Sequence, residues 1–212
     1  MHRNIIFDFD GVIIDSHDVQ VKALTESFKA IYTKGDPPYD DFFKLSGDSL
    51  KNIFTQLGLS LEMIPIYHKV SRENIKLIKI QNGMVELLQK LIKLGCNCAL
   101  CTGKDRERTI EILRHIKIEQ YFKVVVCSDD VANPKPHPES ILVIMKELGA
   151  LPEDTVMVGD GINDVVSAKR AFIKSIAVTW GDISVNDLIK IEPTYIAHNM
   201  SDLMLQIGCH NE

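Results

Sequence analysis

Short apolar segments alternate with longer amphipathic segments along most of this chain. The short segments are rich in β-branched residues, which is typical of strands. The longer segments repeat apolar residues every three or four positions, as in Leu88, Leu91 and Ile92, and this spacing predicts helices. Strand–helix alternation favours an α/β fold, a parallel sheet with helices on both faces. The expected strands are 3–9, 96–101, 123–127, 154–158 and 174–179, with a weaker one at 194–197, and the expected helices between them are 83–94, 104–116, 137–148, 162–171 and 199–207.

Residues 15–80 interrupt this alternation, because they contain helical patterns only. We expect helices at 17–33, 47–57 and 61–80, with Asp15 and Ser16 as suitable N-cap residues for the first of them. The sequence therefore predicts two domains. One is a catalytic core made of 1–14 and 81–212, and the other is an all-α cap made of 15–80, inserted after the first strand.

Composition excludes several classes of protein. The chain has 212 residues, 45% of them hydrophobic and 25% charged, as in ordinary globular proteins. The net charge of −5 provides no basic footprint for nucleic acid. No apolar run reaches the 18 residues of a membrane span, and the first residues show no signal-peptide pattern. We therefore expect a cytoplasmic protein. Nothing in the sequence demands more than a monomer, and we expect a monomer or homodimer.

Five cysteines are present, and three of them lie close together in the apolar segment 96–101. A metal site is the alternative to simple burial there. On a strand Cys96 and Cys98 face one side and Cys101 the other, which separates the three thiols. We expect buried, structural cysteines at these positions. The odd number also argues against a disulfide framework.

Two carboxylates stand one residue apart where the first strand is expected to end. Asp8 and Asp10 flank Phe9, and Gly11 then allows a sharp bend of the backbone. Such close carboxylates repel each other unless a cation or a shared proton lies between them. Mg²⁺, which prefers oxygen ligands, is the natural cation. An isolated pair of this kind is also found in acidic turns, so the rest of the chain has to decide.

Polar groups follow the other expected strands as well. Thr102-Gly103-Lys104 follows the strand at 96–101, Lys135 lies in a proline-rich loop, and Asp160 and Asp164 follow the strand at 154–158. Each has a simpler alternative, namely a helix cap, a solvated loop residue or a helix-surface residue. Their joint appearance at strand ends favours a single site, because ligands bind at the carboxyl ends of parallel strands.

This set of residues suits phosphoryl transfer, which needs an in-line nucleophile and positive charge around the phosphoryl oxygens. Asp8 is the candidate nucleophile, and Asp10 the candidate acid and base for the leaving alcohol and for water. We expect Mg²⁺ to be held by Asp8, Asp160 and Asp10, the last through a nearby carbonyl, with Asp164 holding metal-bound water. Lys135 adds a fixed positive charge.

The loop after the second core strand supplies candidate phosphate donors. The Thr102 hydroxyl and the backbone N–H groups at Gly103 lie near an expected helix start, where anions bind readily. Lys104 directly follows and is placed for a contact on the phosphate side. We therefore count Thr102 with the catalytic residues, and Gly103 and Lys104 with the substrate-binding residues.

The motifs together resemble the haloacid dehalogenase superfamily of phosphohydrolases. The matching residues are Asp8-Phe9-Asp10-Gly11-Val12, Thr102-Gly103, Lys135 in Pro-Lys-Pro-His-Pro-Glu, and Gly159-Asp160 with Asp164. The resemblance implies a Rossmann-like core, Mg²⁺ dependence, Asp8 as nucleophile and Asp10 as acid and base. The dehalogenases of this superfamily lack the second aspartate, so Asp10 favours phosphate chemistry. The cap is similar to that of the phosphoglycolate phosphatase and β-phosphoglucomutase branch.

In that branch the cap closes over the site and contacts the substrate. We expect substrate contacts from Gly11, from His17 at the start of the cap, and from Gly47 in the turn Ser46-Gly47-Asp48. His17 is the candidate for a contact to the leaving group. The alternative for His17 is a solvent-facing position on the first cap helix.

The expected reaction is hydrolysis of a small phosphate monoester, such as phosphoglycolate, a sugar phosphate or a biosynthetic intermediate. Hydrolysis of pyrophosphate is a variant of it. A phosphomutase is the second alternative, although Gln20 stands where the mutase branch has a cap histidine, and His17 lies close enough to substitute. The third alternative is a non-catalytic binding module, which the intact set of acids argues against.

Overall fold

The core contains one sheet, and later segments of the chain add strands on both sides of its first strand. The computed structural model describes residues 2–208, and within them a six-stranded sheet has the order β5-β4-β1-β6-β7-β8. Every pair of neighbours is parallel. The strands are β1 (Asn4–Phe7), β4 (Asn97–Cys101), β5 (Val124–Val126), β6 (Thr155–Gly159), β7 (Lys174–Val178) and β8 (Tyr195–Ala197).

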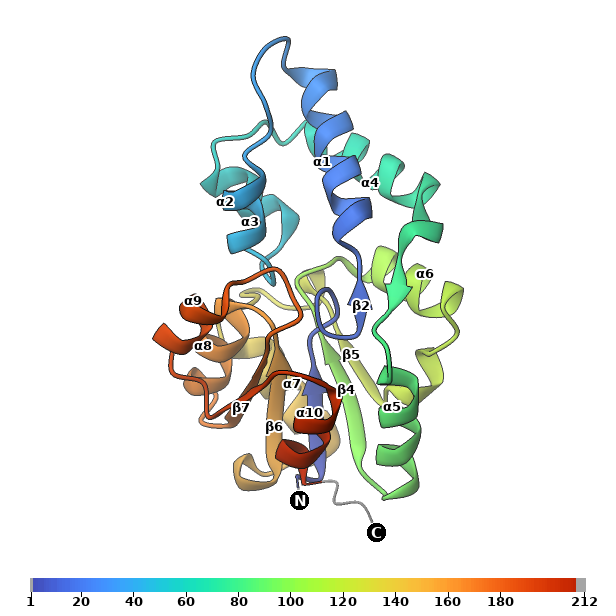
Figure 1. Ribbon diagram of the computed structural model, residues 1–212, viewed down its shortest axis with the longest axis vertical. Coiled ribbons are helices and arrows are strands. Elements are labelled where there is room, and N and C mark those ends of the chain that lie inside the picture. Colours follow the sequence, from blue (N-terminus) through green and yellow to red (C-terminus); the bar gives the residue numbers. More distant parts are fainter. Residues whose placement is uncertain (1, 209–212) are drawn as a thin grey trace.

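Helices cover both faces of this sheet, as the alternation predicts (Figure 1). Side chains of α5, α6 and α10 pack on the face that carries Ile5 and Phe7 of β1. Side chains of α7 and α8 pack on the face that carries Ile6, and α9 packs beside α8. All four residues of β1 are buried, which requires cover on both sides. These helices are α5 (Met84–Lys93), α6 (Arg106–His115), α7 (Glu139–Leu148), α8 (Ile162–Arg170), α9 (Val185–Lys190) and α10 (Met200–Ile207).

The predicted α/β class and its parallel sheet are confirmed, with differences of one or two residues at most element ends. The expected strand 3–9 is longer than β1, which ends at Phe7. The chain turns directly after Asp8, and Gly11 has a φ of +74°. A side chain is disfavoured at this φ, and a β-carbon at Gly11 would overlap Asp160. The short helix α9 has no expected counterpart, because six residues carry little periodic signal.

The cap consists of four helices with an apolar cluster of their own. Figure 1 shows them beyond the carboxyl end of β1. Aromatic rings form much of this cluster: the Phe42 ring lies 6.2 Å from that of Tyr67, and the Phe54 ring lies 6.1 Å from it. The helices are α1 (His17–Ile31), α2 (Tyr39–Lys44), α3 (Leu50–Gln56) and α4 (Met63–Glu73).

The cap differs from the sequence prediction in three places. The expected helix 61–80 is wrong in its last part, because α4 ends at Glu73 and is followed by the 3₁₀ turn Ile75–Leu77 and by β3 (Lys79–Ile80). Strand β3 pairs antiparallel with β2 (Ile14–Asp15) where the chain passes between core and cap. The expected helix 47–57 begins only at Leu50, and α2 was not expected. In α3 the Ser49 side chain caps the helix by accepting from Asn52 N.

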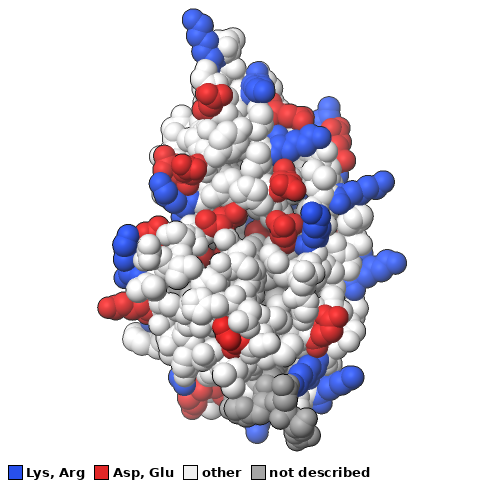
Figure 2. All heavy atoms as spheres, viewed as in Figure 1, with Lys and Arg blue, Asp and Glu red and all other residues white. Residues whose placement is uncertain are grey.

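The cysteines of the apolar segment are buried, as expected. Cys96 and Cys98 pack in the cluster that contains α5, and Cys101 packs in the cluster that contains α7. Cys127 is buried as well, and Cys209 lies outside the described residues. Among residues 2–208, no helix combines the length and apolarity that a membrane crossing needs. Figure 2 shows positive and negative side chains interspersed on the visible face, without a large basic patch.

Candidate active site

The predicted site residues come together at the carboxyl edge of the sheet. Asp8 follows β1, Thr102 follows β4, and Asp160 follows β6. Lys135 lies in the loop before α7, and Asp164 lies in the first turn of α8. Strand β1 is central, and the chain adds strands to both of its sides. Its carboxyl end is therefore the switch point of the sheet, where ligands bind in folds of this kind.

Lys135 is the buried cation of the site. Its side chain is 1% exposed, and its Nζ lies 2.9 Å from Asp8 Oδ1 and 2.6 Å from Asp164 Oδ1. It also donates to the Cys101 carbonyl at 3.0 Å. Burial alone would lower the pKa of Lys135, but Asp164 and Asp8 raise it well above its usual value. The ammonium therefore stays charged and holds these two carboxylates in place.

Asp160 lies next to Asp8 and Asp164, and only one of its two carboxylate oxygens has a hydrogen-bond partner in the described part of the chain. Oxygens of Asp8, Asp160 and Asp164 all lie within 4.8 Å of one another. The Asp160 Oδ1 atom is enclosed and has no hydrogen-bond partner among the described residues. Its Oδ2 atom accepts from Asp182 N at 3.4 Å. An unpartnered carboxylate oxygen is costly inside a protein, so this atom points to a ligand that brings positive charge.

Charge balance makes the same point. Three buried carboxylates face one ammonium, which leaves two formal negative charges. Burial and the charge of Asp164 raise the pKa of Asp8 to about 7, although Lys135 opposes the shift. Burial and the neighbouring carboxylates also raise the pKa of Asp160. A divalent cation bound by oxygen ligands would cancel the excess charge, so these residues fit the predicted Mg²⁺.

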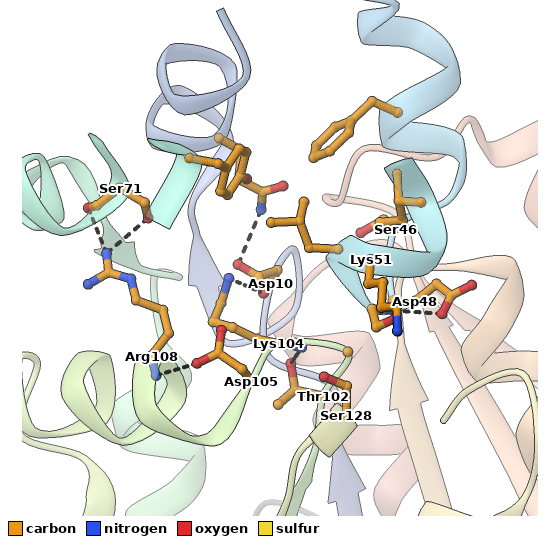
Figure 3. Close-up of a pocket in the computed structure, with 18 of the residues that line it drawn as sticks. Asp10, Ser46, Asp48, Lys51, Ser71, Thr102, Lys104, Asp105, Arg108 and Ser128 are labelled. Atoms are coloured by element: carbon orange, nitrogen blue, oxygen red, sulfur yellow. Dashed lines mark hydrogen bonds and ion pairs between the residues drawn. The ribbon is translucent and has the colours of Figure 1, made fainter. Parts of the chain in front are cut away.

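Asp10 lies apart from the three carboxylates, in a network with the cap. Its Oδ1 atom accepts from Ser16 Oγ at 2.5 Å and from Gln20 Nε2 at 3.2 Å. Its Oδ2 atom pairs with Lys104 Nζ at 3.1 Å. The Asp10 side chain is thus directed toward the cavity rather than the acidic cluster (Figure 3). A contribution of Asp10 to metal binding would therefore come from its backbone carbonyl, as predicted, and not from its side chain.

The loop after β4 brings core and cap into contact. The Thr102 hydroxyl accepts from Lys104 N at 3.1 Å, and Thr102 does not cap α6, whose N-cap is Asp105. A β-carbon at Gly103 would overlap the carbonyls of Gly47 and Asp48. A glycine at position 103 therefore permits the turn of the cap to lie directly on the phosphate-side loop. In this structure the cap is therefore closed on the core.

A cavity of about 200 Å³ lies between cap and core. Its floor is polar and contains Asp8, Asp10, Thr102, Gly103 and Lys104, which are five of the predicted site residues. Figure 3 shows Asp10 and Lys104 facing each other there, with Ser46, Asp48 and Lys51 on the cap side. The cap also contributes an apolar wall, made of Phe42, Phe43, Leu50, Ile53, Ile64 and Tyr67.

The remaining residues that were predicted to contact the substrate lie in different places. Gly47 lines the cavity, and a β-carbon there would lie 3.7 Å from Lys135 Nζ. Gly11 packs against Asp160 behind the cavity. His17 is not among the residues that line the cavity. Its Nδ1 atom lies 2.7 Å from Asp182 Oδ1, and its ring stacks on Phe43 with centroids 4.4 Å apart.

Sequence reasoning missed the supports of Asp10 and of the acidic cluster. Ser16, the N-cap residue of α1, and Gln20, one turn later, share a hydrogen bond of 2.7 Å besides their bonds to Asp10. Their four-residue spacing in an expected helix was a signal that could have paired them. Asp182, which contacts both His17 and Asp160, follows β7 and carried no motif of its own.

Comparisons with known proteins identify the family. Residues 5–178 match the family model of the haloacid dehalogenase-like hydrolases. A pyrophosphatase PpaX from Bacillus mycoides is 32% identical over 206 residues, which cover 95% of each chain. A pyrophosphatase PpaX from Halalkalibacterium halodurans is 30% identical over 209 residues, which cover 97% of each chain.

Solved structures share the fold along almost the whole chain. A crystal structure of a predicted phosphatase from Clostridium acetobutylicum has a TM-score of 0.84 and 25% identity, and the match covers 98% of each chain. A predicted phosphoglycolate phosphatase from Haemophilus somnus has a TM-score of 0.83 at 18% identity, with 97% of each chain covered. The resemblance drawn from the four motifs is confirmed, and the chain belongs to the haloacid dehalogenase-like hydrolases.

Proposed function

We propose that this enzyme is a Mg²⁺-dependent phosphatase that hydrolyses a small phosphate monoester through a phosphoryl group carried on Asp8. This proposal rests on the position of Asp8. The carboxylate lies on the cavity floor at the end of β1, bound to Lys135 and within reach of Asp160 and Asp164. Asp8, Asp160 and Asp164 would hold Mg²⁺, which supplies positive charge against the phosphoryl oxygens when bound.

In the two chemical steps Asp8 acts as the nucleophile, and Asp10 acts first as the acid and then as the base. Lys135 holds Asp8 Oδ1, which leaves Oδ2 to attack phosphorus. The new O–P bond replaces the bond to the leaving oxygen, which takes a proton from Asp10. In the second step Asp10 takes a proton from water, whose oxygen attacks phosphorus and releases Asp8 and inorganic phosphate. Ser16, Gln20 and Lys104 keep the Asp10 carboxylate oriented toward the cavity.

Replacement of Asp10 by Asn is expected to lower phosphate release by about 10²–10⁴-fold, because the amide neither protonates the leaving oxygen nor activates water. The loss is expected to be larger for alkyl phosphates than for p-nitrophenyl phosphate, whose leaving group needs no proton. The measurement is inorganic phosphate released from a panel of phosphorylated metabolites, with Mg²⁺ and with EDTA. Normal rates on alkyl esters would remove Asp10 from the acid/base role. Absence of Mg²⁺-dependent release from every ester would contradict the proposed function itself.

Mg²⁺ is expected to stabilise the protein more at pH 8 than at pH 5. Since the pKa of Asp8 is raised to about 7, the folded state holds a proton between about pH 4 and pH 7 that the unfolded state has lost. Without Mg²⁺, this group therefore costs stability as the pH rises through that window. Mg²⁺ replaces the proton and removes the cost. At Mg²⁺ about 100 times its Kd, the thermal midpoint at pH 8 should rise by roughly 5–10 °C.

The check is thermal unfolding with and without Mg²⁺ at both pH values. The variant Asp160→Asn is expected to lose most of the rise at pH 8, because it removes the negative charge beside the unpartnered oxygen and replaces one carboxylate oxygen by an NH₂ group, which does not bind a cation. An equal rise at pH 5 and pH 8, or one that persists in Asp160→Asn, would place the bound ion elsewhere.

Pyrophosphate is the second candidate substrate, because the relatives from Bacillus mycoides and Halalkalibacterium halodurans carry the name pyrophosphatase. The phosphomutase alternative stays a prediction that a bisphosphate requirement for turnover would support. The Gln20 amide that donates to Asp10 cannot act as an acid or a base as a histidine does, which counts against the phosphomutase alternative. As partners we propose only a small phosphorylated metabolite and, for the chain itself, a monomer or homodimer.

A further inference from the structure

The cap side of the cavity is built for a leaving group with apolar surface. Five of its lining side chains are the hydrocarbon groups of Phe42, Phe43, Leu50, Ile53 and Ile64. Phe42, Phe43 and Ile53 are buried in the apolar cluster of the cap, so their positions are set by packing. They lie across the cavity from the polar floor on which phosphoryl transfer is proposed. An ester whose phosphate lay on the floor would therefore have its alcohol portion against this wall.

One polar atom stands in this apolar wall without a partner. Tyr67 is 7% exposed and lines the cavity, and no described residue forms a hydrogen bond with its hydroxyl. The oxygen is not among the enclosed unsatisfied atoms, so it borders open space. Edge and tilted contacts with Phe54 and Phe42 hold the ring. Burial and the Asp10 charge raise the pKa of Tyr67, which keeps the hydroxyl protonated.

Two other polar side chains of the cavity, Asp48 and Arg108, are already engaged. Asp48 accepts from Asn52 Nδ2 at 2.9 Å and from Gln56 Nε2 at 3.2 Å. Arg108 donates to Ser71 and to Glu111, and its remaining Nε atom is enclosed by protein. These groups brace the cap on itself and on α6, so they are not available to a ligand in the way that the Tyr67 hydroxyl is.

The charges of the cavity argue in the same direction. Lys135 is bound to Asp8 and Asp164, and Lys104 is paired with Asp10. Lys51 also lines the cavity on its cap side, but this residue is exposed, so water screens its charge. The leaving half of pyrophosphate is a second phosphate, which would have to leave water for a wall of phenyl and alkyl groups. Loss of hydration without a compensating charge is unfavourable. Apolar carbon against the same wall is stabilised instead.

We propose that the cavity selects organic phosphate monoesters whose leaving group has an apolar body and an oxygen that hydrogen-bonds to the Tyr67 hydroxyl, in preference to pyrophosphate. This inference rests on the proposed function for its reaction, but the binding of the leaving group is a separate property. Tyr67 is then a specificity-determining residue of the cap.

The test compares phenyl phosphate, its three hydroxyphenyl isomers and pyrophosphate at matched free Mg²⁺. We expect kcat/KM for phenyl phosphate to exceed that for pyrophosphate by at least about tenfold. At least one hydroxyphenyl isomer should be better than phenyl phosphate by about three- to tenfold, the value of one neutral hydrogen bond. Tyr67→Phe should remove this advantage through KM, with little change in kcat.

The matched control is Tyr32→Phe, the same change at a cap tyrosine that does not line the cavity and whose hydroxyl accepts from Ser60 N at 2.8 Å. This variant is expected to keep the advantage of the hydroxylated isomer. A higher kcat/KM for pyrophosphate would overturn the inference and leave the proposed phosphatase function standing. So would an advantage that survives in Tyr67→Phe, or the absence of any advantage among the three isomers.

A binding measurement separates the inference from the chemistry. In Asp8→Asn, isothermal titration with Mg²⁺ is expected to show tighter binding of the preferred hydroxyphenyl phosphate than of pyrophosphate. Tyr67→Phe in the same background should weaken the first and spare the second. Tighter binding of pyrophosphate would overturn the inference even if the wild-type protein released no phosphate from any ester, an outcome that would by itself contradict the proposed function.

Discussion

Asp8→Asn is expected to lower Mg²⁺-dependent phosphate release from p-nitrophenyl phosphate by at least about 10⁴-fold, because the amide oxygen cannot form the phosphoryl intermediate. The fold should remain intact. Asparagine has nearly the same shape, and Lys135 keeps Asp164 and the Cys101 carbonyl as partners. Removal of one of three crowded carboxylates also relieves their repulsion. The expected outcome is therefore loss of activity without loss of stability.

The measurement pairs the rate of p-nitrophenol release with the thermal midpoint in EDTA. A matched comparison is Asp182→Asn, which changes a nearby carboxylate that contacts Asp160 through its backbone N–H and His17 through its side chain. This variant should retain most of the turnover. Substantial turnover in Asp8→Asn would exclude Asp8 as the nucleophile. A large fall in the thermal midpoint would instead assign Asp8 a mainly structural role.

Lys135→Met is expected to reduce the free energy of unfolding by about 3–5 kcal/mol in the absence of Mg²⁺. Methionine fills a similar volume, so the loss comes from charge. Asp8, Asp160 and Asp164 would lie within 4.8 Å of one another with no ammonium among them. The Cys101 carbonyl would also lose the donor that it has at 3.0 Å. Breaking a buried ion pair from one side leaves its partner charges uncompensated, which is the source of the cost.

Urea unfolding at pH 8 and at pH 5 provides the measurement. The loss should be smaller at pH 5, because the folded state then holds protons on carboxylates whose pKa is raised. Lys104→Met is the matched control. The Lys104 side chain is 17% exposed, and its partner Asp10 keeps Ser16 and Gln20, so a loss of only about 0–1 kcal/mol is expected. Equal stability of Lys135→Met and the wild type would contradict the charge balance described for the site.

Local sequence patterns were sufficient to predict the core and most of the residues of its site. Strand β1 is predictable because its three successive apolar residues, Ile5 to Phe7, need cover on both faces, which a sheet between two helical layers provides. The approach of Asp8, Thr102 and Asp160 follows from the same topology, since the carboxyl ends of parallel strands share one edge. The short helices α2 and α9 were missed because six residues hold less than two turns of periodic signal.

The cap depends more strongly on contacts between distant residues. Lys79 and Ile80 were expected at the end of a helix, yet they pair with Ile14 and Asp15 across the entry to the cap. Pairing between segments far apart in sequence overrides local propensity. His17 was expected to face the substrate, and the structure instead places its ring on Phe43 and beside Asp182. No local pattern around residue 17 specifies the loop after β7 as its neighbour.

The alternation of strands and longer helices in the core and the identities of the reactive groups follow from the sequence alone, because periodicity and motif spacing are local properties of the chain. Only the tertiary structure decided which charges meet, for example that Lys135 binds Asp8 and Asp164 while Asp160 keeps an unpartnered oxygen. It also decided that Tyr67 presents its hydroxyl in an apolar wall. These properties depend on distances of a few ångströms between residues that are far apart in the chain, and on the exclusion of water between them, which no single segment encodes.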